Sequence, residues 1–217
     1  MRRRVIAATM ALIALLFSPA VLADAAADVA EADRLSDRGK FEQAIEFYSR
    51  AIDSGELSGY DLAAAYYSRG LSQGRLRNSE AAIRDYNSAL AADPTLVSGW
   101  SSLCYQRSRD EAQLIEALLA CDRALELDPA HGPTYGIRAE IRGMQGNIAA
   151  AESDYAEAIR LAPDNWALYF NRGVLYHRAD RRDEASRDFS TAYGMAPGWA
   201  REHPAAVKMF REYGFAK

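Results

Sequence analysis

The sequence lacks the groups of residues on which catalysis and metal binding depend. Its three histidines, His131, His177 and His203, are scattered and have no metal-ligand spacing. It contains neither a phosphate-binding glycine loop nor a Gly-x-Ser-x-Gly nucleophile motif. We therefore expect no catalytic residue, no metal site and no cofactor, and an enzyme is the least favoured class of function.

Period-two alternation of polar and apolar residues is also absent, so we expect no β-sheet. Lys and Arg number 26 against 30 Asp and Glu, and Arg2, Arg3 and Arg4 precede the first acidic residue. An acidic chain without a basic block binds nucleic acid poorly, so we expect no nucleic-acid partner. The apolar share of 49% and the charged share of 26% are those of a globular protein.

One long apolar run is present, and it lies near the N-terminus. The three arginines precede a 13-residue apolar run from Val5 to Phe17, and Val21 and Ala23 offer small residues at the −3 and −1 positions of a cleavage site. A bilayer-spanning helix needs about 20 residues. We expect residues 1–23 to be a signal peptide cleaved after Ala23, with a periplasmic or secreted product. An uncleaved membrane anchor is the alternative.

The rest of the chain is an array of similar units. Prolines at 94, 129, 163 and 197 are spaced by 35, 34 and 34 residues, and each ends a pair of amphipathic helical segments. In the last unit, small residues stand where the two helices must touch, at Gly173, Ala185 and Ala192. Tyr176 and Phe189 fill the space beside them. The same places hold similar residues in the upstream units, and a weaker copy opens the array.

This pattern resembles that of tetratricopeptide repeat proteins of the exported bacterial type. The resemblance implies an all-α, right-handed α-solenoid of about five helix-turn-helix repeats over residues 24–197. It implies a protein-binding scaffold, with no membrane span in the mature chain and a monomer as the default state. We expect repeats near 25–58, 63–96, 97–131, 132–165 and 166–199.

Helical spacing predicts the elements within these repeats. The alanine-rich residues from Asp24 to Val29 are expected to fray before the first helix. In residues 200–217, Ala206, Met209, Phe210 and Tyr213 have i, i+3, i+4, i+7 spacing, which predicts a capping helix over the last repeat. The expected helices are Val29–Arg38, Phe41–Ser54, Tyr60–Gly74, Asn78–Ala91, Leu96–Arg107, Glu111–Leu127, Pro133–Gln145, Ile148–Leu161, Trp166–Arg178 and Arg182–Tyr193.

The two cysteines, Cys104 and Cys121, occupy positions 8 and 24 of one repeat, where the others have Gly or Ala and an aromatic residue. Both positions point into the interface of the helix pair. An exported chain with an even number of cysteines usually pairs them, so we expect a disulfide. Two buried free thiols are the alternative. The spacing also resembles exported bacterial tetratricopeptide proteins with a paired cysteine in one repeat.

A charge pattern recurs in three of the repeats. Position 7 is always Arg and position 23 is always Asp, whereas the cysteine repeat has Leu103 and Ala120 there. Because both charges are present or absent together, we expect a structural ion pair within each repeat. The alternative is that the arginines bind an acidic partner. The expected pairs are Arg69 with Asp85, Arg138 with Asp154, and Arg172 with Asp188.

The family resemblance also places an inner groove along the first helix of each repeat. We expect this groove to bind a protein or peptide segment, unless its residues pack against a neighbouring repeat instead. Tyr67 and Leu71 stand where a clamp for a C-terminal carboxylate needs Lys and Asn, so that ligand is not supported. An architectural subunit of a cell-envelope complex, using the convex face or the ends, is the alternative function. The groove residues carried over by register are Tyr67, Leu71, Arg75, Tyr105, Arg109, Glu140, Met144, Phe170, Val174, His177 and Arg178.

Overall fold

The computed structural model describes residues 24–198 and 203–215, so the signal peptide predicted for residues 1–23 lies outside the described residues. All regular secondary structure in these ranges is helical. The helices are α1 (Ala25–Asp37), α2 (Phe41–Asp53), α3 (Gly59–Arg75), α4 (Ser79–Ala92), α5 (Val97–Ser108), the short 3-10 helix η1 (Glu111–Gln113), α6 (Leu114–Leu127), α7 (Gly132–Met144), α8 (Ile148–Leu161), α9 (Trp166–Arg178), α10 (Arg182–Met195) and α12 (Pro204–Glu212).

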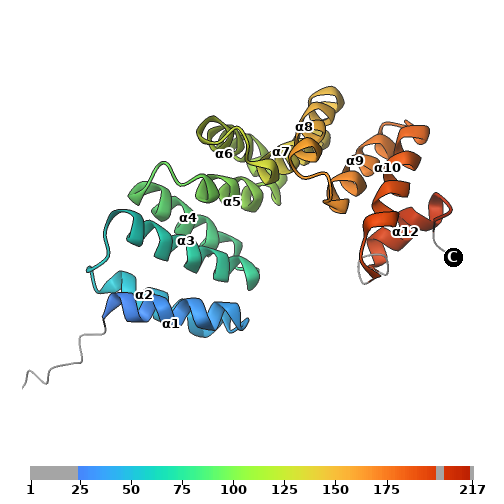
Figure 1. Cartoon of the computed structure of the whole chain (residues 1–217). Coiled ribbons are helices and arrows are strands. Elements are labelled where there is room, and N and C mark those ends of the chain that lie inside the picture. The colour runs from blue at the N-terminus through green and yellow to red at the C-terminus, as the bar shows by residue number, and fades with distance from the viewer. Residues whose placement is uncertain (1–23, 199–202, 216–217) are drawn as a thin grey trace, which may run out of the picture.

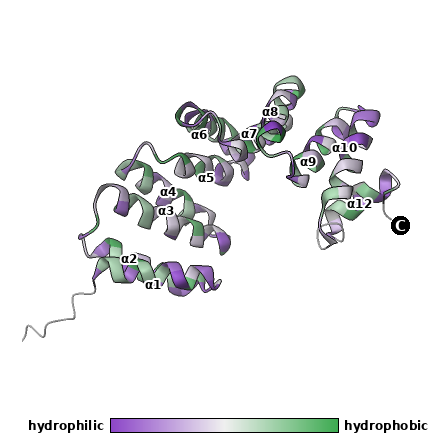
Figure 2. Cartoon of the chain, in the orientation of Figure 1, coloured by the Kyte–Doolittle hydropathy of each residue, from purple (hydrophilic) through white to green (hydrophobic). Residues whose placement is uncertain are grey.

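Consecutive helices pack as pairs, α1 with α2 through α9 with α10, and each second helix packs on the first helix of the next pair. The pairs stack into an arch with α5 and α7 on its inner side and α6 and α8 on its outer side (Figure 1). Hydrophobic and hydrophilic residues alternate around each helix, as this packing requires (Figure 2). The predicted all-α solenoid of helix pairs is confirmed.

Small residues allow the two helices of a pair to approach each other closely. A Cβ atom added at Gly70 would lie 2.7 Å from Cε1 of Tyr86, and one added at Gly173 would lie 2.9 Å from Cε1 of Phe189. Real Cβ atoms do not approach this closely, so no larger residue fits without moving the ring. The small and large residues that recur with a fixed period in the sequence therefore form the contact seam between the two helices of a pair.

The pair formed by α5 and α6 is joined by a disulfide between Cys104 and Cys121. Both residues are fully buried in a core cluster with Leu103 and Ile141. Their Cα atoms lie 5.2 Å apart. The bond crosses the seam at the place where the glycine and aromatic ring meet in the α3–α4 and α9–α10 pairs.

Loss of this disulfide is expected to lower the free energy of unfolding by about 3 kcal/mol, because the bond closes a short loop in the unfolded chain. Urea unfolding would compare the oxidised wild type with the Cys104→Ala/Cys121→Ala variant. Wild type unfolded in the presence of reductant is the third sample. Mass spectrometry of unreduced, alkylated protein is the direct check. Two alkylated thiols in wild type purified from an oxidising compartment would contradict the pairing.

The first helix begins earlier than the sequence indicated. The side chain of Asp24 accepts a hydrogen bond from the backbone N–H of Ala26 at 3.0 Å, which caps the helix at its N-terminus. Ala25 is buried and its N–H donates to the Glu56 carboxylate at 3.3 Å. The expected fraying up to Val29 is therefore wrong, because a cap and a contact with the link after α2 hold this turn.

The helix α12 covers the open end of the last pair. Its residues Ala206 and Phe210 are buried against Phe189 and Tyr193 of α10. Helix α12 therefore covers this end through Phe210, as the first helix of a further repeat would. A hydrophobic end of this kind has to be covered in a solenoid, because no next repeat buries it.

Candidate functional site

Three arginine–aspartate pairs lie within repeats, each linking the first helix to the second. In the last repeat, Nε and Nη2 of Arg172 donate to the two carboxylate oxygens of Asp188 at 2.7 and 2.8 Å. These hydrogen bonds, opposed by burial, raise the pKa of Arg172. Arg69 with Asp85 and Arg138 with Asp154 have the same two-pronged geometry.

The pairs are enclosed by packing and do not form an open surface. Asp154 is 3% exposed, and the arginine guanidinium groups lie over tyrosine rings at position 4 of the same helix, such as Tyr135 for Arg138. Arg138 also donates to Asp122 of the preceding repeat at 2.6 Å, and Arg142 donates to Asp154 at 2.7 Å. The geometry is that of a structural link within and between repeats, not of a ligand site.

The sequence pattern missed an equivalent link in the first repeat. There Arg50 of α2 donates to Asp28 of α1, with Nε 3.0 Å from Oδ2. Here the acidic residue lies on the first helix and the arginine on the second, at other positions of the repeat. The pattern at positions 7 and 23 therefore does not include this pair. The signal available was an acidic residue, Asp28, at position 4, where the later repeats have an aromatic residue.

Two cavities open between successive first helices. We call the first the α3–α5 cavity; its volume is about 520 Å³. Its lining combines exposed apolar side chains, Leu71 and Tyr105, with arginines, the buried Gln106 amide and the buried Ser101 hydroxyl. It is lined by Leu71, Gly74, Arg75, Arg77, Tyr86, Ser101, Ser102, Tyr105, Gln106, Arg109 and Ile137.

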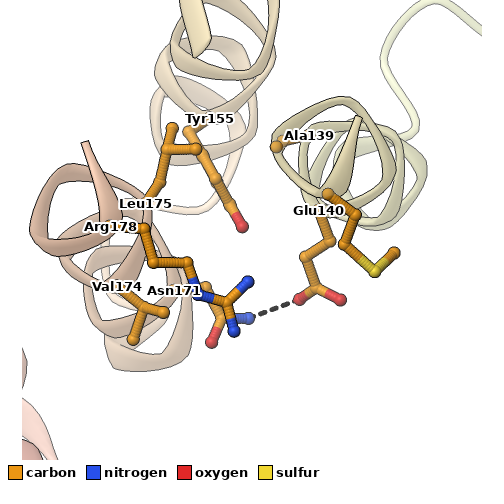
Figure 3. Close-up of a pocket in the computed structure, with 9 residues that line it drawn as sticks. Ala139, Glu140, Tyr155, Asn171, Val174, Leu175 and Arg178 are labelled. Atoms are coloured by element: carbon orange, nitrogen blue, oxygen red, sulfur yellow. Dashed lines mark hydrogen bonds between the residues drawn. The ribbon is translucent and has the colours of Figure 1, made fainter. Parts of the chain in front are cut away.

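The second, the α7–α9 cavity, has a volume of about 270 Å³. Glu140 projects from α7 and Arg178 from α9 toward the space between these helices, and Asn171 lies between them (Figure 3). The Asn171 amide donates to the Glu140 carboxylate. The lining residues are Ala139, Glu140, Gly143, Met144, Tyr155, Asn171, Val174, Leu175 and Arg178.

Two ionisable groups of the α7–α9 cavity have shifted pKa values. Burial raises the pKa of the Glu140 carboxyl, and the hydrogen bond from Asn171 acts in the opposite direction. Burial and the charge of Glu140 likewise raise the pKa of Tyr155, whose hydroxyl lies on the cavity wall (Figure 3). A neutral phenol, a carboxylate and a guanidinium can bind the polar groups of a peptide, but they form no nucleophile–base arrangement.

Most of the groove residues predicted from the family register line these two cavities. Leu71, Arg75, Tyr105 and Arg109 lie around the first, and Glu140, Met144, Val174 and Arg178 around the second. The side chains of Leu71, Tyr105 and Met144 are exposed by 40%, 47% and 44%. Positions 9 and 13 of the first helices therefore provide a half-open surface with apolar contacts.

Three predicted groove residues are placed elsewhere. Tyr67 packs beside Tyr86, with ring centroids 5.9 Å apart, as part of the core around the disulfide. Phe170 lies against Phe210 of α12 at 5.6 Å, and His177 Nδ1 lies 2.8 Å from the hydroxyl of Tyr213. The expectation that Phe170 and His177 face an open groove is wrong, because α12 and the turn after it pack over them.

Some cavity residues were not predicted from the sequence. Ser102 and Asn171 stand at position 6 of their repeats, next to position 5, which the predicted residues Tyr67 and Phe170 occupy in theirs. Gln106 stands at position 10, next to the predicted Tyr105 at position 9. Adjacent helices cross at an angle, so the lining extends one residue to the side of a strict helical row. A prediction that also took in positions 6 and 10 of each repeat would have included these three residues.

Two further observations limit the site. No described helix combines the length and apolarity that a bilayer crossing requires. Within residues 24–198 and 203–215, no cluster of three or more His, Cys, Asp or Glu side chains has the arrangement of a metal site.

Comparison with known proteins agrees with the fold. Residues 29–96 and 139–198, more than half of the chain, match the tetratricopeptide repeat family, and the chain belongs to that family. The two matched segments omit α5 and α6, the helices that carry the disulfide. Tetratricopeptide repeat proteins are generally non-enzymatic scaffolds for protein–protein interaction.

Individual relatives are distant. The tetratricopeptide repeat and J domain-containing co-chaperone DNJ1 of Cryptococcus neoformans is 34% identical over 74 residues, covering 34% of this chain and 14% of the relative. This chain therefore spans only a small part of that relative's length.

Two solved structures share the fold. TTC0263, a thermophilic TPR protein of Thermus thermophilus, has a TM-score of 0.65 and 20% identity over 88% of this chain and 97% of its own. YrrB, described as a TPR protein with an unusual peptide-binding site, has a TM-score of 0.65 and 22% identity over 87% and 92%. Likeness at this level of identity shows the fold alone.

Proposed function

We propose that this chain is a scaffold that holds an extended segment of a partner protein along the inner side of its arch, without chemistry of its own. The observation that carries the proposal is the convergence of positions 9 and 13 from four repeats on two cavities between the first helices. Tyr105 and Met144 offer exposed apolar contact there. A few such anchors usually supply most of the binding energy.

The surroundings of the cavities favour a segment over a folded domain. Each cavity lies between two neighbouring first helices and opens toward the inner side of the arch. Polar side chains of the lining, such as Gln106 and Asn171, can bind the backbone groups of a chain that forms no sheet with the scaffold. YrrB, with the same fold, is described as having a peptide-binding site, which supports this class of ligand here.

We also propose that the scaffold acts outside the cytoplasm. The support is the arginine-led apolar segment in residues 1–23 together with the two cysteines of α5 and α6, which stand close enough to form a disulfide. N-terminal sequencing of the protein from fractionated cells tests this: a chain that retains its first residues in the cytoplasmic fraction would contradict export.

Site-specific photo-crosslinking tests the groove. A photoreactive phenylalanine analogue placed at Tyr105 or Met144 is expected to capture partner protein in cells, whereas one at Leu119 of α6 is not. Tyr105→Ala is expected to weaken partner binding by about 2 kcal/mol, since truncation of an aromatic anchor has effects of this size. Equal melting temperatures for wild type and variant would show that the fold is intact. Partner retained equally by both would contradict the groove.

The outer face supplies the second candidate function. Ile115 and Leu119 are 70% and 65% exposed, and they stand one helical turn apart on α6, on the outer side of the arch. An exposed apolar pair of this kind suits an architectural subunit that contacts a complex through its convex face. Crosslinking from Leu119 in place of Tyr105 would favour this function over the first.

A further inference from the structure

We propose that the α3–α5 cavity binds an acidic segment, with carboxylates held by Arg75, Arg77 and Arg109 and an apolar side chain seated on Leu71 and Tyr105. The inference rests on the proposed function and names the chemistry of its partner. It follows from the charges around the cavity, their lack of carboxylate partners within the described part of the protein, and the exposed apolar side chains beside them.

The three arginines gather from different parts of the chain. Arg75 is the last residue of α3, Arg77 lies in the turn after it, and Arg109 caps the C-terminus of α5. All three are exposed. No aspartate or glutamate is among the residues that line the cavity, although acidic residues outnumber basic ones in the whole chain. The cavity therefore has three positive charges with none of opposite sign in its wall.

These arginines differ from most others in the described part of the chain. Arginines such as Arg69, Arg138 and Arg172 are held by carboxylates at hydrogen-bonding distance. Arg75 and Arg77 form no ion pair with any described residue, and neither does Arg109. Guanidinium groups present paired donors that match a carboxylate, so an unpaired group at a cavity rim is ready for an external one.

Helix ends explain part of this arrangement but not all of it. A cation near a helix C-terminus is favoured by the helix dipole, which accounts for Arg75 and Arg109 individually. Arg77 is different, because it adopts a positive φ of 62° in the turn. The corresponding turns after α1 and α7 place Gly39 and Gly146 there, with φ of 72° and 76°. An arginine in this left-handed conformation is disfavoured locally, so the geometry of the turn does not explain the presence of Arg77.

The arginines lie next to an apolar surface. The Arg109 guanidinium carbon is 5.9 Å from the centroid of the Tyr105 ring, and its Nη1 donates to the Tyr105 hydroxyl at 3.3 Å. Tyr105 still leaves 47% of its surface exposed, and Leu71 on the facing helix leaves 40%. The cavity thus offers an apolar seat and cationic groups within one space, which complements a segment that alternates acidic and large apolar residues.

Short fluorescein-labelled peptides test the inference by fluorescence anisotropy with the whole purified chain. One peptide combines glutamates with leucine and phenylalanine, a second has glutamine for each glutamate, and a third has lysine. The acidic peptide is expected to bind about tenfold or more tightly than the glutamine peptide, since charged hydrogen bonds are the stronger ones. Its affinity is expected to fall as salt is raised, because the arginines are exposed.

Matched variants separate the cavity from the charge of the whole protein. Arg75→Gln/Arg109→Gln is expected to weaken the acidic peptide about tenfold. Arg123→Gln/Arg187→Gln removes the same charge from exposed positions on α6 and α10 and is expected to change binding less than about twofold. Equal weakening by both double variants would overturn the inference, because it would show a response to net charge only.

The remaining outcomes also decide the matter. Equal affinity of the wild type for the acidic and glutamine peptides overturns the inference. If Leu71→Ala/Tyr105→Ala then weakens both peptides, the inner-side binding function stands without the acidic preference. If no peptide binds, the inference is overturned, and crosslinking from Tyr105 in cells remains the separate test of the proposed function.

Discussion

Asp188→Ala is expected to lower the free energy of unfolding by about 3 kcal/mol, because it leaves the guanidinium of Arg172 half-buried without its carboxylate. The Arg172 side chain is 20% exposed and that of Asp188 is 8% exposed. The substitution removes both hydrogen bonds of the pair. Among the described residues, no second carboxylate forms an ion pair with Arg172.

Removal of both partners is expected to cost less than removal of the aspartate alone. In Arg172→Met/Asp188→Leu, apolar groups of similar size replace the ions, and no charge is left without a partner. Urea unfolding of Arg172→Met, Asp188→Leu and the double variant, monitored by circular dichroism, would give the coupling energy from the double-mutant cycle. Glu80→Ala is the control: the Glu80–Arg84 pair is exposed and spans 3.9 Å, so its loss is expected to cost less than about 0.5 kcal/mol. A coupling energy of zero for Arg172 and Asp188 would contradict a structural pair.

Much of the fold could be predicted because its signals are local. The bounds of α8 (Ile148–Leu161) and α9 (Trp166–Arg178) are those expected from the sequence, since helical period, small-residue positions and the proline all lie within one repeat. The ion pairs within repeats were predictable for the same reason. The start of α1 was not, because Asp24 and the contact of Ala25 with Glu56 act outside the repeat pattern.

The candidate site was predictable only in part, because its shape depends on contacts between repeats. The register gave the helix face that turns inward, which located Leu71 and Tyr105. It did not give the path of the C-terminal tail, so Phe170 and His177 were assigned to a groove that α12 and Tyr213 in fact cover. The bond from Arg138 to Asp122 was missed because it joins two repeats.

Phe210→Ala is expected to have an effect of about 3–5 kcal/mol on the free energy of unfolding, as large aromatic truncations in a core do. Phe210 is fully buried, and its ring lies 5.6 Å from that of Phe170, 6.5 Å from that of Phe189 and 5.1 Å from that of Tyr193. Loss of the ring would remove the anchor of α12 and expose these partners to water. Tyr60→Ala, at a side chain that is 68% exposed, is the control and is expected to be nearly neutral.

The loss of stability is expected to be confined to one end of the arch. Each repeat of a solenoid contacts only its neighbours, so the last pair responds first. Hydrogen exchange followed by mass spectrometry is expected to show faster exchange in α9, α10 and α12 of Phe210→Ala, with α3 and α4 unchanged. Phe170→Ala should have the same pattern, because its ring packs between Phe189 and Phe210. A Phe170→Ala protein that exchanges and melts like wild type would instead show that this ring lies free on the inner face. Helix α12 would then be held in place by its contacts with α10 alone.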